Sequence, residues 1–119
     1  MKLKLVVIRS KDINKLSDFY TKFGITFNKH KHRKGPLHYS SVIDGTVFEI
    51  YPLLKNQSEV DSSIRLGFEV ENLDALVEQL KLEKIELVQL PQTSEFGRYA
   101  VVKDHEGRKI ELSERIASF

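Results

Sequence analysis

The sequence of 119 residues contains no cysteine, so it has no disulfide framework, no cysteine-based zinc site and no thiol nucleophile. It also lacks an excess of one charge: 19 Lys and Arg stand against 17 Asp and Glu, for a net charge of +2 with histidine neutral. This balance argues against nucleic acid or a membrane as partner, since both favour a clustered basic excess. The apolar run near the start is too short for a signal peptide or a membrane span. We therefore expect a cytoplasmic protein.

Several catalytic signatures are missing as well. The sequence has no glycine-rich phosphate loop, no nucleophile elbow and no paired His–carboxylate triad. Its length and its apolar content (40%) are typical of a soluble chain with one hydrophobic core. We therefore expect a single domain over residues 1–119.

An internal repeat organises the chain. The stretches DGTVFEI (Asp44–Ile50) and EGRKIEL (Glu106–Leu112) share an acid, a glycine, two spacers, an apolar residue, a glutamate and another apolar residue. Their glutamates, Glu49 and Glu111, stand 62 positions apart. Earlier in each half the spacing is 60, which places Asp12 opposite Asn72. A repeat of this length indicates two copies of one supersecondary unit.

Each copy has the same order of predicted elements. Helical spacing of apolar residues indicates helices at 12–23 and 73–83, with Asn72 as N-cap and Gly24 suited to the C-terminal end. Asp44-Gly45 predicts a tight hairpin. The expected strands are 3–8, 25–28, 37–43 and 46–51, then 64–70, 85–90, 98–103 and 108–113. The prediction is an α+β fold of two βαβββ modules, at about 1–54 and 64–119, with a polar linker at about 55–63.

Strand alternation predicts where the repeated glutamates point. Phe48 and Ile50 share one face of their strand and Glu49 takes the other; Glu111 stands in the same way between two apolar neighbours. If the apolar faces pack under the helices, both glutamates face away from them. The open sides of two such sheets can curl toward each other, so that the carboxylates approach across a cleft.

The chain resembles the vicinal oxygen chelate superfamily in three features. These are the double βαβββ order, the repeated acid-Gly-x-x-apolar-Glu motif and the opening of the second helix, VENLDAL. That superfamily includes glyoxalases, bleomycin- and fosfomycin-resistance proteins and extradiol dioxygenases. The resemblance covers nearly the whole chain. It implies a curved-sheet cleft that binds small molecules, and a homodimer that often builds each cleft from both chains.

The resemblance also implies positions for a divalent metal, with ligands on the first and last strand of each half. The last-strand positions correspond to Glu49 and Glu111, and the first-strand positions to Leu5 and Arg65. Leu5 has no donor atom and Arg65 carries a positive charge, so no metal cofactor is favoured. The alternative is Ni, Zn, Mn or Fe held by the two glutamates. We expect Arg65 to pair with Glu49 or Glu111, and Glu111 is the candidate general base if the protein is an enzyme.

Other candidate residues surround this predicted cleft. We expect His38 to line it, and Tyr51, Tyr99 and Phe96 to stack against a flat ligand or to serve as hydrophobic cover. The basic run at 29–34 is either a solvated hairpin tip or an anion site at Arg33 and Lys34. Within this run His30 and His32 share a strand face, and we expect only adventitious Zn or Ni capture there, without further ligands nearby.

Three functions remain open from the sequence. The favoured one is a metal-free protein that binds or sequesters a small molecule. The second is a metal-dependent lyase, isomerase or dioxygenase of glyoxalase type, against which Leu5 and Arg65 weigh. The third is a non-catalytic interaction module, for which the near-neutral charge makes a nucleic-acid partner a poor candidate.

Overall fold

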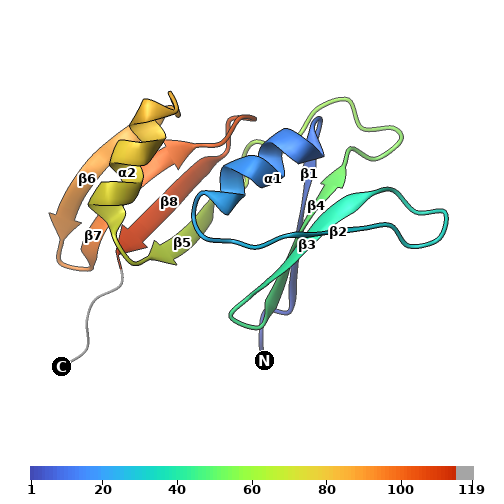
Figure 1. Cartoon of the computed structure of the whole chain (residues 1–119), viewed down its shortest axis with the longest axis horizontal. Helices are drawn as coiled ribbons and strands as arrows, with labels where there is room; N and C mark the ends of the chain where they lie inside the picture. Colours follow the sequence, from blue (N-terminus) through green and yellow to red (C-terminus); the bar gives the residue numbers. More distant parts are fainter. Residues whose placement is uncertain (115–119) are drawn as a thin grey trace. The chain divides into compact units, whose positions relative to one another are not determined.

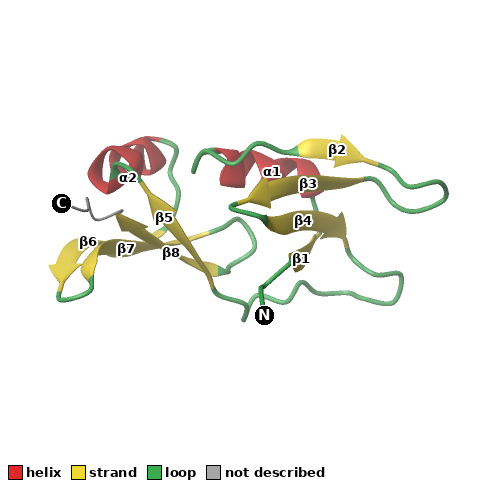
Figure 2. Ribbon diagram, turned by 90° about the horizontal axis from the view of Figure 1, so that it is seen from below, coloured by secondary structure: helices red, strands yellow, loops and turns green. Residues whose placement is uncertain are grey.

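The computed structural model describes residues 1–114, and the chain forms two compact units that divide after Asp61. We call them the first half and the second half. Each half holds one helix and one four-stranded mixed sheet, and the helix covers one face of its own sheet (Figures 1 and 2). No helix in the described range is long and apolar enough to cross a membrane.

The first half reads β1 (Leu5–Ser10), α1 (Ile13–Thr21), β2 (Asn28–His30), β3 (His38–Ile43) and β4 (Thr46–Pro52). Its sheet has the order β1-β4-β3-β2, with β1 parallel to β4 and the other pairs antiparallel. The predicted α+β class and the βαβββ order are confirmed. The strand predicted at 25–28 is displaced, because Phe27 lies outside the β2–β3 ladder and packs its ring against Phe48, with centroids 6.1 Å apart.

The second half repeats the pattern with β5 (Leu66–Val70), α2 (Leu73–Leu82), β6 (Leu87–Ser94), β7 (Gly97–Lys103) and β8 (Lys109–Glu114). Its strand order is β5-β8-β7-β6, with β5 parallel to β8. The sheet therefore has the same topology as the first, as the sequence repeat predicts.

The capping residues explain why both helices start where they do. The side chain of Asp12 accepts a hydrogen bond from the backbone N–H of Lys15 (3.0 Å), and Asn72 accepts one from Ala75 (3.2 Å). Each cap satisfies one of the backbone donors that the first turn of a helix leaves without a partner. The 60-residue spacing in the sequence thus corresponds to two equivalent helix starts.

Turn geometry fixes the hairpin between β3 and β4. Asp44 and Gly45 have positive φ angles of 48° and 84°. Two consecutive residues with positive φ are typical of the type I′ turn, whose twist suits a two-residue hairpin. Gly24, at φ 97° just after α1, follows the prediction for a helix C-terminal end.

Burial shows that the helices cover the apolar strand faces. In β4, Phe48 and Ile50 are buried, and the ring of Phe48 meets that of Tyr20 from α1 edge to face with centroids 5.4 Å apart. In β8, Ile110 and Leu112 are fully buried. The glutamates between these residues lie on the face of each sheet opposite its helix, which we call the open face of that sheet. The predicted orientation of Glu49 and Glu111 is therefore confirmed.

Candidate functional site

A cavity of about 710 Å³ lies on the open face of the second sheet. Four residues singled out in the sequence line it together: Arg65, Tyr99, Phe96 and Glu111. A smaller hollow of about 330 Å³ shares Arg65 and Glu111 and adds the backbone around Gly67. Cavities of a few hundred Å³ accommodate small organic ligands. The second half by itself thus brings the predicted residues into one hollow.

The cavity combines an aromatic surface with polar ends. Tyr99 and Val101 reach the open face because they alternate with Ala100, which is buried under the helix. Gln92 donates a hydrogen bond to the hydroxyl oxygen of Tyr99, which orients the phenol. Phe96, in the turn between β6 and β7, is 87% exposed. Such an exposed ring is available to stack on a ligand.

Arg65 and Glu111 lie in this cavity without forming an ion pair with each other or with another described side chain, and both are exposed. The predicted pairing of Arg65 with Glu111 is thus not formed. The reason is geometric: Gly67, one residue into β5, is the residue directly opposite Glu111, and Arg65 lies just before the strand begins. Both charged groups are therefore available to a ligand.

A second group of predicted residues gathers on the open face of the first sheet. His38 is buried, with 1% of its surface exposed, and its ring stacks on Tyr51 at 4.1 Å with an interplanar angle of 8°. Its Nε2 atom lies 3.5 Å from Oε2 of Glu49, close enough for an ion pair but not aligned as a hydrogen bond. On the other side of Tyr51, the guanidinium of Arg9 lies 4.9 Å from the ring centroid.

The residues at the family's metal positions do not fit a metal ion. The strand pairing places Val7 directly opposite Glu49 and Gly67 directly opposite Glu111. Neither has a side-chain donor, and two residues earlier the chain offers Leu5 and Arg65. Neither the position directly opposite each glutamate nor the position two residues earlier therefore supplies a metal ligand.

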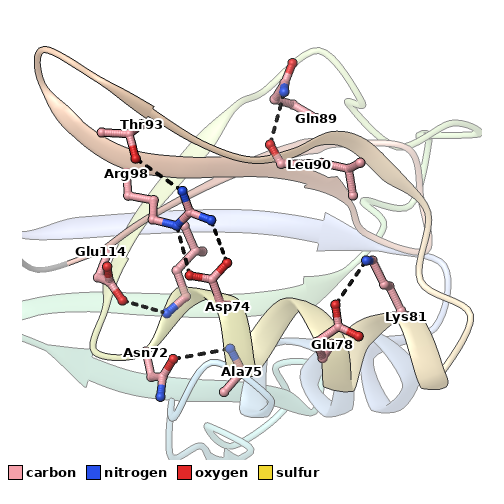
Figure 3. Close-up of polar contacts among 11 residues, drawn as sticks. Asn72, Asp74, Ala75, Glu78, Lys81, Gln89, Leu90, Thr93, Arg98 and Glu114 are labelled. Carbon is pink, nitrogen blue, oxygen red and sulfur yellow. Dashed lines mark hydrogen bonds and ion pairs between the residues drawn. The ribbon is translucent and has the colours of Figure 1, made fainter.

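An ion pair holds β7 against the first turn of α2 (Figure 3). Arg98 donates from Nε and Nη2 to the two carboxylate oxygens of Asp74, at 2.9 and 2.7 Å, and from Nη1 to Thr93. A paired, planar contact of this kind fixes direction as well as distance. Since Arg98 is the neighbour of Tyr99, the pair anchors the strand that carries the aromatic surface of the cavity.

This pair gives a measurable pH effect. The hydrogen bond from Arg98 lowers the pKa of Asp74 below its ordinary value of 3.8, and the positive charge adds to the shift while burial opposes it. A lowered folded-state pKa means that the pair contributes stability above the unfolded pKa and loses it as pH falls through the folded pKa. We expect a carboxyl-carbon NMR titration to place the midpoint of Asp74 below 3.8. In Arg98→Gln the midpoint should return toward that value; an unchanged midpoint would contradict the contact.

Some residues of the cavity were not singled out in the sequence. Gln89, Ser94 and Ser113 also line it. They are small or neutral polar residues on strands. Only their position on the open face of the sheet indicates that they line the cavity. Alternation does assign Ser113 to the face of Glu111, but register shifts between β6 and β7 prevent that reasoning for Gln89.

Comparison with known proteins agrees with this architecture. Among solved structures, an antibiotic-binding protein from Streptomyces sp. CB03234, TnmS3, is 19% identical with a TM-score of 0.74, covering 98% of this chain and 97% of its own. The oxidase ChaP-H2 is 14% identical with a TM-score of 0.77, covering 99% and 96%. A hypothetical protein from S. aureus, SA1046, is 19% identical with a TM-score of 0.72, covering 97% of each chain. At these identities the likeness shows the fold alone.

Comparison with curated protein sequences finds no matching relative. A family model does match, over residues 2–112, nearly the whole length of the chain. The chain belongs to the Glyoxalase/Bleomycin resistance protein/Dioxygenase superfamily.

Proposed function

We propose that the protein binds a small molecule on the open face of its second sheet, without the metal site common in its family. One observation carries the proposal: Arg65, Glu111, Tyr99 and Phe96 line a single cavity of about 710 Å³. Pockets that bind organic ligands combine an apolar lining with a few polar groups that fix orientation. This cavity has that composition.

The lining indicates the chemical class of the ligand. Tyr99 and Phe96 offer ring faces, which favour a flat aromatic molecule. Arg65 has only donors and Glu111, when ionised, only acceptors. A ligand that satisfies both carries an acceptor or anionic group near one edge and a hydroxyl or amide donor near another. A protein of the same fold is described as antibiotic-binding, which is consistent with a small-molecule ligand.

A binding screen tests the proposal. Ligand-observed NMR on the full chain would compare planar aromatics that carry both a carboxylate and a hydroxyl with two controls of similar size. One control is a planar aromatic without polar groups, and the other is a non-aromatic sugar acid. We expect binding of the first class only. Equal binding of the sugar acid would point to charge alone, and no binding by any planar polar compound would count against the site.

The absence of the family's metal is a separate part of the proposal. It rests on Leu5, Val7, Arg65 and Gly67, which supply no metal ligand at the family's first-strand positions or directly opposite Glu49 and Glu111. Elemental analysis of untagged protein measures the amount of Ni, Zn, Mn and Fe per chain. We predict that Glu111→Gln does not lower the amount of any of these metals. About one ion per chain that disappears in Glu111→Gln would make a glyoxalase-type enzyme the leading function.

Two further expectations from the resemblance stay predictions. Glu111 as a general base requires a substrate placed against its carboxylate, and its exposure leaves room for one. Homodimer formation follows from the family resemblance. The small-molecule proposal depends on neither.

A further inference from the structure

Three of the chain's four histidines gather at one end of the first sheet. His30 ends β2, His32 follows in the loop, and His38 begins β3 directly opposite His30. Their ring centroids are separated by 6.0 Å (His30–His32), 5.9 Å (His30–His38) and 5.3 Å (His32–His38). Imidazole is a common ligand of first-row transition metals. The sequence predicted no further ligand near His30 and His32, and the structure supplies one.

The hydrogen bonds of His38 show which of its nitrogens is available. Nδ1 lies 3.2 Å from the carbonyl oxygen of Pro36, which can only accept, so Nδ1 carries the proton. Nε2 is buried and has no hydrogen-bond partner. In a neutral ring its lone pair then lies 3.5 Å from a carboxylate oxygen of Glu49. Two acceptors that face each other in a buried place are unfavourable unless a cation or a proton lies between them.

This arrangement matches the outer shell of a metal-binding histidine. Such a histidine commonly donates its other ring N–H to a backbone carbonyl, which fixes the tautomer and the ring orientation. Here Pro36 supplies the carbonyl, and stacking on Tyr51 at 4.1 Å holds the plane of the His38 ring. The buried imidazole is therefore oriented before any ion arrives.

We propose that His30, His32 and His38, with Glu49 as fourth donor, form a binding site for a divalent transition-metal ion such as Zn²⁺. All four residues belong to the first half. Glu49 is one of the family's ligand positions, whereas the three histidines lie outside the family's ligand set, and none of the four lines the cavity of the second half. With Zn–N bonds of about 2.0–2.1 Å, imidazoles around a tetrahedral ion have centroids roughly 5 Å apart, close to the separations here. A carboxylate completes the charge and the coordination number.

Binding requires the exposed histidine rings to move. In the described part of the chain no group of three or more His, Cys, Asp or Glu side chains is placed to hold a metal ion as it stands. His38 is fixed, but His30 and His32 are exposed and can turn their rings toward its Nε2. A backbone hydrogen bond from Gly35 to His32 (2.7 Å) closes a turn in this loop, and the ring centroid of His32 lies 5.3 Å from that of His38 in β3. Closure of the two exposed rings on the fixed one is the expected change.

The lysines interleaved with these histidines do not all oppose a cation. Lys29 is directed to the other side of the strand, where its Nζ lies 3.4 Å from Asn14 and 5.4 Å from the ring centroid of Tyr39. Alternation along β2 and β3 places His30 and its partner His38 on the same side of the sheet as Glu49. The positive charge of Lys29 therefore lies on the side of the strand opposite the histidines.

Titration calorimetry of the untagged full chain with ZnCl₂ tests the proposal. We expect one ion per chain in the wild type. The double variant His30→Gln, His32→Gln should bind zinc at least roughly tenfold more weakly, because removing even a residue that only hydrogen-bonds to a metal ligand lowers affinity by that much. Both residues are exposed, so folding should be preserved. His105→Gln, which removes the fourth, also exposed histidine, is the matched control and should bind as the wild type does. Glu111→Gln should also leave binding unchanged, because all four proposed donors belong to the first half.

Imidazole NMR supplies a second readout that does not depend on a variant of the buried residue. Long-range ¹H–¹⁵N spectra should find the proton of His38 on Nδ1 in the free protein, and its Nε2 signal should shift when Zn²⁺ is added. Zinc binding that survives the double variant, or that falls equally in His105→Gln, would overturn the proposal. So would a His38 Nε2 signal that is unaffected by a stoichiometric amount of zinc.

Discussion

Replacement of Arg108 by methionine is expected to lower the free energy of unfolding by roughly 3–5 kcal/mol, the range for removing one partner of a buried ion pair. Arg108 is fully buried, and its Nη1 donates to Asp104 and to Glu106, each at 3.2 Å. Without the guanidinium the Asp104 carboxylate stays in a fully buried position without its charge partner. Chemical denaturation of both proteins measures the difference.

The neighbouring lysine provides the control for this prediction. Lys109→Met makes the same change of charge at the next position along the chain, which is exposed, and should shift stability by about 0.5 kcal/mol or less. Adding Asp104→Asn to Arg108→Met should recover part of the loss, because it removes the buried charge. If Arg108→Met costs no more than Lys109→Met, the pair is not structural.

The second large effect concerns the cavity of the second half. For a planar ligand found by the screen, Tyr99→Ala should weaken binding by roughly 2 kcal/mol, or about thirtyfold, through the loss of apolar contact area. Arg65→Leu should weaken it about tenfold, because a hydrogen bond to a charged group is lost. Since Arg65 is exposed and has no partner among the described side chains, its replacement should change stability by about 1 kcal/mol or less.

A matched variant separates the cavity from general basic charge. Arg33 lies exposed in the loop of the first half, within the basic run considered as an anion site. Arg33→Leu removes the same charge as Arg65→Leu and should leave the affinity unchanged. If Arg33→Leu weakens binding as much as Arg65→Leu, the ligand is held by the basic loop or by net charge, and the cavity is not its site.

Local signals in the sequence predicted the elements well where they have a direct physical cause. Asn72, predicted as an N-cap, caps its helix because a short polar side chain can reach the free backbone donors of the first turn. Asp44 and Gly45 make the hairpin because both adopt positive φ. The direction of Glu111 followed from alternation with Ile110 and Leu112. None of these inferences required long-range information.

Contacts that form where the chain folds back on itself could not be predicted from the sequence. Nothing in the spacing of His30, His32 and His38 says that the loop folds back and places the rings within 6.0 Å of one another. Arg108, next to a turn and between charged residues, has the local pattern of a solvated side chain, yet it is fully buried. Its burial depends on Asp104, whose carboxylate also accepts the backbone N–H groups of Glu106 and Arg108 at 2.8 and 3.1 Å.

The most direct test of the central claim is to map the bound ligand on the protein by ¹H–¹⁵N NMR and intermolecular nuclear Overhauser effects. If the open face of the second sheet is the binding site, shift changes should cluster at the amides of Arg65, Tyr99 and Glu111. Protons of the ligand ring should show contacts to the rings of Tyr99 and Phe96. Saturable binding whose shift changes and contacts lie elsewhere, such as the basic loop at 29–34, would contradict the account.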